Sequence, residues 1–332
     1  MNRRTFIQLG SGAMGLALLA ACDRLPPLPS KIPRIAYFTY ERVSLDAPRQ
    51  AAFEQGLADL GLINGQTIVV DWVYVDDQPD VPLTTRAQEL VSRAPQVIVV
   101  SYTPTLVATA QATRTIPIVS VLPHRDLRAL GLIQSEGHPG GNVTGLGGNP
   151  DIAYGKLVEL LKDMVPSITR LAYLHNPSTP GSAGKMEVSQ TAAGQLGLEF
   201  IELQAANPPE MEAAFASAAS VGANGLVVES DAAFSINTPI MDLSLRYGLP
   251  TIYSQIEGYV DYGGLMAYSP DVVATHRRAA NYVDKILKGV SPAELPVEEA
   301  TIFNFAINST TATTLGLAIP TDVMLQATQI FQ

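Results

Sequence analysis

Cysteine, tryptophan and charged side chains are all scarce in this sequence. Its 332 residues contain one cysteine and one tryptophan, and only 16% are Asp, Glu, Lys or Arg. A single cysteine excludes an internal disulfide framework. No apolar run reaches the roughly 20 residues that a transmembrane helix needs, because the run near the start is shorter and is broken by glycines. The chain is nevertheless 47% hydrophobic, which is enough for a substantial core in one large or two medium domains.

Basic residues are the scarcer of the two charged kinds, with 21 Lys and Arg against 31 Asp and Glu. The formal net charge of −10 argues against nucleic acid as a partner, since phosphate binding requires a basic face. It argues equally against electrostatic docking on an anionic membrane. The acidity by itself indicates a soluble surface.

Residue patterns that carry out catalysis or bind metals are missing from the sequence. The histidines form no H-E-x-x-H motif, and no G-x-S-x-G motif occurs after the first 22 residues. The stretch Gly181–Met186 resembles a phosphate-binding loop, but Thr179 replaces its first glycine and Met186 its final Ser or Thr. We therefore expect no enzyme activity, no cofactor and no metal. The four histidines are His124, His138, His175 and His276.

The first 22 residues have the composition of a bacterial export signal. Arg3 and Arg4 precede a short apolar run that ends in Leu19-Ala20-Ala21-Cys22. The paired arginines are similar to a twin-arginine signal, with the general secretory route as the alternative. Leu-Ala-Ala-Cys resembles a lipobox, whose cysteine is acylated and becomes the new N-terminus; otherwise Cys22 is a small apolar residue of the signal. The sequence predicts an exported protein that is lipid-anchored to the outer face of the cytoplasmic membrane.

A proline-rich segment, residues 23–33, separates this signal from the rest of the chain. It contains four prolines and no hydrophobic period. Such a composition favours an extended tether between the anchor and the folded body.

Short β-branched runs alternate with helical patterns along the remaining chain. Phe53, Gly56, Leu57 and Leu60 recur at the spacing of one helix face, and Gly61 is a stop signal. The alternation predicts βαβ units, and hence parallel sheets with helices on both faces. The strands expected in the first half are Arg34–Thr39, Thr67–Val75, Val97–Ser101 and Ile116–Val121, and those in the second half are Arg170–Asn176, Leu198–Leu203, Gly225–Ser230 and Pro250–Ser254.

Glycine pairs indicate two places where the chain crosses between two lobes. They lie in Pro139–Gly145 and in Tyr262–Leu265. Glycines there can absorb the dihedral changes of a hinge, and ordinary loop glycines are the alternative. The following strand, Leu265–Ser269, and its helix are expected to return to the first lobe. The expected boundaries are 34–144 with 268–296 for lobe 1, and 145–267 with 297–332 for lobe 2.

Several motifs resemble those of one known family and occur in the same order. They are Phe53–Leu57, Pro139–Leu146, Gly263–Tyr268, Tyr282–Gly289 and the ending Ile307–Pro320. In these motifs the chain is similar to the TrpX-type ABC transporter substrate-binding proteins. The resemblance implies a type I periplasmic-binding-protein fold, with two Rossmann-like lobes, parallel sheets and three hinge crossovers. It also implies an ABC permease as partner, and members with known ligands take amino acids such as tryptophan and tyrosine.

Ligands of open parallel sheets bind beyond the carboxyl ends of the strands. In the first half, Thr103 is expected to N-cap the helix after Ser101, and Pro104 suits its first turn. The N–H groups at such a helix start suit a carboxylate, and the hydroxyls of Ser101, Thr103 and Thr105 complete that side of the site. A well-capped helix without a ligand is the alternative.

The strand ends of the second half predict the opposite side of the site. Asn176 can bond to either end of an amino acid, and an Asn-Pro turn is the alternative. Glu229, Asp231 and Glu257 are strand-end acids that suit an ammonium group; the resemblance favours Asp231, and solvated loop acids are the alternative. Aromatic residues near the strand ends can stack on the ligand. The predicted ligand-binding residues are Tyr37, Ser101, Thr103, Thr105, Asn176, Asp231 and Glu257.

Together these features predict an extracytoplasmic solute-binding lipoprotein of an ABC importer. We expect a monomer that captures a small molecule between its lobes, either an amino acid in general or an aromatic one. One alternative is a receptor of the same fold that signals through a membrane partner. The other is a secreted hydrolase, which turnover of a bound ligand would reveal.

Overall fold

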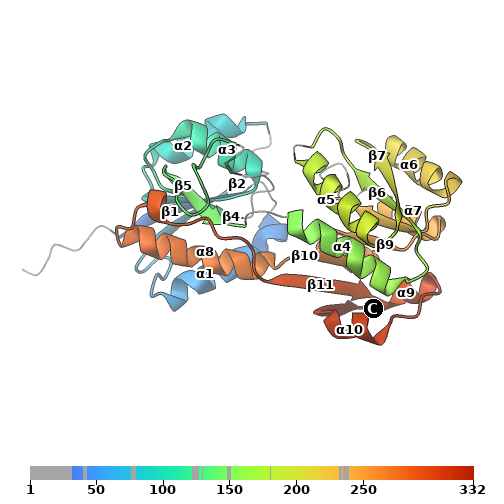
Figure 1. Cartoon of the computed structure of the whole chain (residues 1–332). Helices are drawn as coiled ribbons and strands as arrows, with labels where there is room; N and C mark the ends of the chain where they lie inside the picture. Colours follow the sequence, from blue (N-terminus) through green and yellow to red (C-terminus); the bar gives the residue numbers. More distant parts are fainter. Residues whose placement is uncertain are drawn as a thin grey trace, which may run out of the picture.

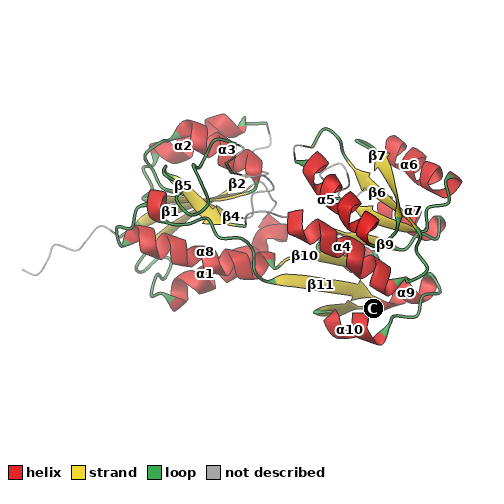
Figure 2. Ribbon diagram, in the orientation of Figure 1, coloured by secondary structure: helices red, strands yellow, loops and turns green. Residues whose placement is uncertain are grey.

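The computed structural model describes residues 32–39, 43–75, 80–121, 127–128, 130–147, 151–179, 181–231, 234 and 239–332. Two lobes lie side by side, each with its own sheet and with helices on both faces (Figures 1 and 2). This architecture confirms the predicted two-lobed α/β fold with parallel sheets. Cys22, the export signal and residues 23–31 of the tether lie outside the described residues.

Lobe 1 is built on a five-stranded sheet with the order β2-β1-β3-β4-β5, in which every pairing is parallel. Its strands are β1 (Arg34–Thr39), β2 (Val69–Tyr74), β3 (Val97–Ser101), β4 (Ile118–Val121) and β5 (Val143–Leu146). Its helices are α1 (Val43–Asp59), α2 (Leu83–Ser92), α3 (Thr103–Ala112), α8 (Val272–Leu287) and the short η4 (Pro292–Glu294).

Strand residues of lobe 1 alternate between two cores, one on each face of the sheet. Tyr37 and Val99 belong to the core under α1 and α8, whereas Phe38 and Val100 belong to the core under α2 and α3. Because successive side chains of a strand point to opposite faces, a strand buried on both sides must be apolar along its whole length. This explains the nearly continuous apolar runs of the sequence.

Lobe 2 is built on a seven-stranded sheet with the order β12-β11-β10-β9-β8-β6-β7, parallel except where β10 meets β11. Its strands are β6 (Arg170–His175), β7 (Glu199–Gln204), β8 (Gly225–Val228), β9 (Thr251–Tyr253), β10 (Met266–Pro270), β11 (Phe303–Asn308) and β12 (Gln329–Phe331). Its helices are α4 (Asp151–Met164), α5 (Ser182–Gln195), α6 (Pro208–Ser220), α7 (Ile240–Arg246), α9 (Ser309–Thr314), α10 (Thr321–Gln326) and the short η3 (Val260–Tyr262). As in lobe 1, one core lies under α4 and α5 and the other under α6 and α7.

Three segments of the chain join the lobes. The first leaves β5 at Leu146 and leads to α4, and the second passes from β10 at Pro270 into α8. The third runs from η4 to β11 and returns the tail to lobe 2. Figure 1 shows the result: α8, drawn in orange, lies against α1 of lobe 1, although the strands before and after it in the chain, β10 and β11, belong to lobe 2.

The third segment is bonded to the other two. The backbone of Glu298 bonds to Gly145 near the end of β5 and to Gly147 at the start of the first segment. Further along, the carbonyl of Ile302 accepts a hydrogen bond of 2.9 Å from the N–H of Asp271 on the second. The joining segments therefore lie side by side between the lobes.

The glycine pairs that were expected at crossings lie within the lobes. Gly140 and Gly141 precede β5, and Gly263 and Gly264 precede β10. Gly264 has a packing reason, since a Cβ there would lie 2.7 Å from the ring of Tyr253. The paired glycines thus mark tight turns and close packing, whereas the crossings use other residues.

The strand expected at Leu265–Ser269 forms as β10, but it stays in lobe 2, and only α8 returns to lobe 1. Met266 and Ala267 are buried in the two cores of lobe 2, one on each face of the sheet. A run that is apolar on both faces fits the interior of either sheet, so its sequence does not reveal which one it joins. At the earlier boundary, β5 keeps residues up to Leu146 in lobe 1.

Candidate functional site

The carboxyl edges of both sheets face the segments that join the lobes. In lobe 1, the end of β5 at Leu146 forms a bridge with Glu298 of the third segment. In lobe 2, the end of β10 at Pro270 lies opposite Phe303, where β11 begins. The carboxyl ends of the parallel strands in each lobe therefore face the other lobe, which is where a ligand of this architecture binds.

The turn between β3 and α3 differs from the prediction by one residue. Thr103 is the first residue of the helix, and Tyr102 occupies the cap position with φ 74° and ψ 148° and no side-chain cap bond. The expectation that Thr103 is the N-cap is therefore wrong, because Tyr102 alone makes the turn after the strand. Pro104 lies in the first turn of the helix, as predicted.

The hydroxyls predicted for this side of the site are mostly used within lobe 1. Thr105 is fully buried and its Oγ1 bonds to the carbonyl oxygens of Ser101 and, at 2.9 Å, Tyr102. Ser101 is 1% exposed, and its Oγ lies 3.4 Å from Nε2 of His276. Thr103 is 9% exposed at the start of the helix. Of these three residues, Thr103 is the most exposed.

His276 closes this part of lobe 1 from α8. Its Nδ1 lies 2.7 Å from the carbonyl oxygen of Val272, so Nδ1 carries the proton and Nε2 accepts from Ser101. Burial, together with the nearby charge of Arg49, lowers the pKa of His276 to about 3. The imidazole is therefore neutral at physiological pH.

Tyr37 lies in the core beneath the strand ends rather than at their surface. It is fully buried, with the rings of Phe53 and Trp72 at 5.5 and 4.8 Å between centroids. Its hydroxyl is buried without a hydrogen-bond partner among the described residues. Burial, and next the negative charge of Asp46, raises the pKa of this hydroxyl well above its usual value.

Arg49 is a member of this region that the sequence reasoning missed. It extends from α1, is 5% exposed, and its Nη1 donates a hydrogen bond of 2.6 Å to the hydroxyl of Tyr102. Within the described part of the chain it forms an ion pair with the fully buried Asp46, whose carboxylate oxygen lies 4.0 Å from Nη1. A signal was present: Arg49 stands four residues before Phe53, on the apolar stripe of its helix, where a charged residue calls for a buried partner.

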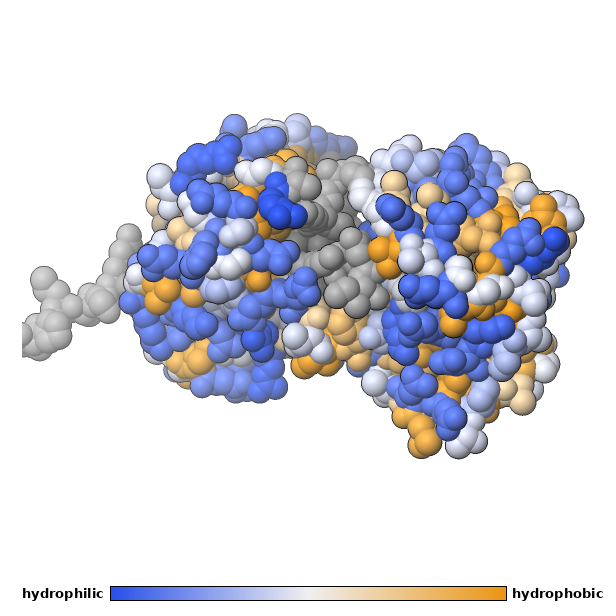
Figure 3. All heavy atoms as spheres, in the orientation of Figure 1, coloured by the Kyte–Doolittle hydropathy of each residue, from blue (hydrophilic) through white to orange (hydrophobic). Residues whose placement is uncertain are grey.

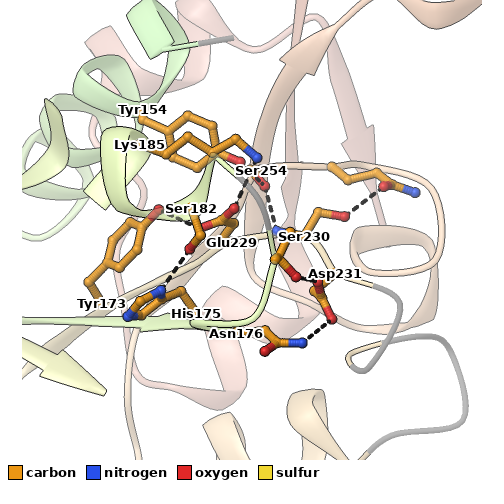
Figure 4. A network of polar contacts seen from close by, with 12 residues as sticks. Tyr154, Tyr173, His175, Asn176, Ser182, Lys185, Glu229, Ser230, Asp231 and Ser254 are labelled. Atoms are coloured by element: carbon orange, nitrogen blue, oxygen red, sulfur yellow. Dashed lines mark hydrogen bonds and ion pairs between the residues drawn. The ribbon is translucent and has the colours of Figure 1, made fainter. Parts of the chain in front are cut away.

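On lobe 2, the structure brings Asn176 and Asp231 together (Figure 4). Nδ2 of Asn176 donates a hydrogen bond of 3.1 Å to one carboxylate oxygen of Asp231, and the hydroxyl of Thr179 bonds to the other. Oδ1 of Asn176 accepts from the N–H of Ser178, which closes an Asn-Pro turn. Asn176 thus forms the turn and also fixes the orientation of the Asp231 carboxylate. Asp231 remains half-buried at the end of β8.

A buried network supports the loop of Asn176 from beneath. Glu229 is 1% exposed and forms an ion pair of 2.9 Å with Lys185, which is itself 5% exposed. Glu229 also accepts from Ser182 at 2.7 Å and from the Tyr173 hydroxyl at 3.1 Å. His175 lies 2.7 Å from the Ser182 hydroxyl, so both ends of the loop are fixed (Figure 4). Glu229 is therefore a structural acid and has no access to a ligand.

The third strand end of lobe 2 carries the last predicted residue, Glu257. It is exposed, whereas the neighbouring Gln255 bonds through Oε1 to the Ser230 hydroxyl at 2.7 Å. The N–H of Ser230 in turn donates to Ser254 at 2.8 Å, beside Asp231. Within the described residues, the side chain of Glu257 forms no hydrogen bond or ion pair with Asn176 or Asp231.

Three properties of the residues that the structure describes bear on the site: metal-ligand groups, membrane spans and surface hydropathy. No group of three His, Cys, Asp or Glu side chains within them could hold a metal ion. None of the helices in the same part of the chain is both long and apolar enough to cross a bilayer. Figure 3 shows mostly hydrophilic residues on the visible face of both lobes, with apolar residues in small separate groups.

The chain matches one known protein family over most of its length. Residues 39–331 match the family described as ABC transporter substrate binding protein. No curated protein matches the chain.

Three solved bacterial structures share the fold over nearly the whole chain. A conserved domain protein from Vibrio cholerae is 28% identical with a TM-score of 0.77, covering 90% of this chain and 100% of that one. An ABC domain from Streptococcus pneumoniae in complex with L-Trp is 24% identical with a TM-score of 0.78, covering 91% and 100%. A substrate binding protein with adhesive properties from Clostridium difficile, in a ligand-free, open structure, is 21% identical with a TM-score of 0.75, covering 91% and 100%.

Proposed function

Because the chain belongs to the family of ABC transporter substrate binding proteins, we propose that it captures an amino-acid-like molecule between its lobes for import through an ABC permease. Members of this family bind ligands and are not enzymes, which removes the secreted hydrolase from the alternatives. The resemblance inferred from the motifs is thereby confirmed.

The observation that carries the proposal is the half-buried carboxylate of Asp231 at the carboxyl edge of lobe 2. Asn176 and Thr179 fix its orientation, and each carboxylate oxygen can accept more than one hydrogen bond. An ammonium group placed there would form a charge-assisted bond with an acid that needs no rearrangement.

The opposite edge suits the other end of an amino acid. Helix α3 begins at Thr103 with Pro104 in its first turn, so the positive end of its dipole lies at the carboxyl end of β3, on the edge that faces the joining segments. A carboxylate is the natural partner of such a helix start. The Streptococcus pneumoniae structure in complex with L-Trp supports the same class of ligand for this fold.

Closure of the two lobes over the ligand follows from this arrangement. The ligand would contact lobe 1 by one end and lobe 2 by the other, while only three segments join the lobes. The lobes assigned by sequence, with the adjustments at Leu146 and Pro270 described above, are the bodies that would move. A ligand that touches both shifts the population toward the closed form.

The proposed position at the membrane rests on the sequence alone. Cys22 follows Leu-Ala-Ala and the paired Arg3 and Arg4 start the signal. Mass spectrometry of the mature protein from its natural host would find a diacylated or triacylated Cys22 at the N-terminus. A mature N-terminus elsewhere, or one without acyl chains, contradicts the anchor.

A thermal-shift screen of the soluble body against the twenty L-amino acids, nucleobases and small organic acids tests the ligand class. We expect an amino acid to raise the melting temperature, and Asp231→Asn to abolish the shift because the ammonium loses its counter-charge. Asp242→Asn, at an exposed acid of α7, is the matched control and should bind normally. A shift with organic acids alone, or an unaffected Asp231→Asn, would refute the assignment.

A further inference from the structure

Tyr102 has a backbone conformation that its side chain disfavours. Among the described residues, it and Ala94 are the only ones other than glycine with a positive φ, and the value at Tyr102 is 74°. With ψ at 148°, this conformation is essentially confined to glycine, and it costs another residue on the order of 1–3 kcal/mol. The strain lies at the carboxyl end of β3, on the edge of lobe 1 that faces the other lobe. A tyrosine at this turn therefore indicates that the side chain itself is needed.

A buried arginine holds the ring of Tyr102. Nη1 of Arg49 donates to the Tyr102 hydroxyl at 2.6 Å, and the guanidinium carbon lies 5.8 Å from the ring centroid. The Arg49 side chain is 6% exposed, while Tyr102 is half-buried. Desolvating a guanidinium is unfavourable unless it has partners, and the Tyr102 hydroxyl is one of them beside Asp46.

A third observation concerns the Tyr37 hydroxyl, on the strand that pairs with β3. The Tyr37 hydroxyl, on β1 next to β3, is fully buried and has no partner among the described residues. The charged groups that act on this hydroxyl are Asp46 and Arg49 of α1. A buried hydroxyl without a partner is unusual in a lobe whose other strand-end polar groups are bonded.

We propose that Tyr102 is a ligand-contact residue of the cleft and that Arg49 is its positioning residue, acting through the Tyr102 hydroxyl. The inference rests on the proposed function and deepens it by naming a contact for the apolar part of the ligand. An aromatic ring held in place before binding loses little conformational freedom on contact, so it contributes area without an ordering cost.

Two substitutions separate the strain from the side chain. Tyr102→Gly removes both, whereas Tyr102→Ala removes the ring and keeps a Cβ in the positive-φ conformation. Without ligand, the glycine variant should melt at a higher temperature than the alanine variant. Calorimetric titration with the L-amino acid that gives the largest shift for the unaltered protein should show at least tenfold weaker binding for both.

A double-mutant cycle tests whether Arg49 acts through Tyr102. Tyr102→Phe and Arg49→Met should each weaken binding of the same amino acid about five- to tenfold, because the ring loses the hydrogen bond that fixes its position before binding. The combined variant should bind no more weakly than either one, since both break one bond. If Arg49→Met does not fold, Arg49→Lys takes its place in the cycle, because lysine lacks the planar fork.

Each outcome decides between distinct conclusions. Binding by Tyr102→Gly within about twofold of the unaltered protein overturns the contact role, and multiplicative losses in the cycle overturn the positioning role of Arg49. If the unaltered protein binds none of the twenty L-amino acids, the proposed function falls and this inference falls with it.

Discussion

His276 shows how one residue couples the stability of lobe 1 to pH. Its ring is neutral in the folded protein because burial lowers its pKa from 6.5 to about 3. In the unfolded chain the ring takes up a proton as the pH falls below 6.5, while the folded form resists protonation until about pH 3. The contribution of this residue is therefore fully present above pH 6.5 and is lost progressively between pH 6.5 and pH 3.

Replacement of His276 by Gln tests this linkage. The amide can donate to Val272 and accept from Ser101 without titrating, so the variant should lose less stability than the unaltered protein between pH 7 and pH 4. The difference should reach a few kcal/mol, on the order of 1.4 kcal/mol per pH unit below 6.5. Urea unfolding at a series of pH values measures it, and parallel profiles for the two proteins would show that His276 does not titrate as described.

Single residues also mark how far sequence reasoning reaches at the site. The strand-end rule identified Asn176 and Asp231, which do meet, and the turn after Ser101. It did not reveal that the hydroxyl of Ser101 is engaged by His276, 175 residues further along the chain. Hydrogen bonds between distant segments leave no local pattern, so the sequence predicts which loops form a site better than which side chains are available in it.

At the scale of elements, α5 is attached to the sheet of lobe 2 by a buried ion pair. Lys185 and Glu229 have side chains only 7% and 1% exposed. Lys185→Met should destabilise the protein by about 3–5 kcal/mol, because it leaves a buried carboxylate without its counter-charge.

The matched control for that pair is on the surface. Arg246 and Glu212 form a 3.0 Å pair with side chains 60% and 57% exposed, and Arg246→Met should change the free energy of unfolding by less than about 1 kcal/mol. Denaturant unfolding of both variants makes the comparison. Equal effects would mean that burial does not strengthen the Lys185 interaction.

The packing of α1 on α8 depends on Gly56. A Cβ at this position would lie 2.3 Å from the carbonyl oxygen of Arg277. Gly56→Ala should therefore push the helices apart and cost about 1–3 kcal/mol. Gly184→Ala, in the exposed part of α5 with nothing within 4 Å, should stabilise by about 0.5–1 kcal/mol instead. Melting temperatures that shift in the same direction for both would contradict the close approach of α1 and α8.

Elements divide clearly into those that the sequence predicts and those that it does not. The bounds expected for β1 and β3 are the observed ones, because β-branched runs between turn signals leave little choice. The strands β11 and β12 were not expected. β11 pairs antiparallel with β10, which sets it outside the βαβ pattern that organises the rest of the chain.

At the scale of the whole molecule, the lobes are separate cores joined by three segments. None of the hydrophobic clusters formed by the described residues spans both lobes. The one tryptophan of the chain, Trp72, packs in lobe 1, whereas both lobes contribute to the far-UV circular dichroism.

Unfolding of the ligand-free protein should therefore occur in two steps. We expect the urea midpoint reported by Trp72 fluorescence to differ from that reported by circular dichroism, since the lobes have little reason to melt together. Addition of a ligand that contacts both lobes should bring the midpoints together. Coincident midpoints without ligand would show that the joining segments couple the lobes more strongly than their size indicates.

The return of α8 to lobe 1 has a consequence for folding during synthesis. Ala279, Tyr282 and Val283 belong to the core of the lobe that starts at Arg34, and Phe305 and Val323 complete the other lobe. A growing chain cannot finish either core on the ribosome until synthesis has passed α8, although an ordinary two-domain chain would complete its first half early. Both lobes thus mature late and almost together, which leaves the chain without a finished core for most of its synthesis.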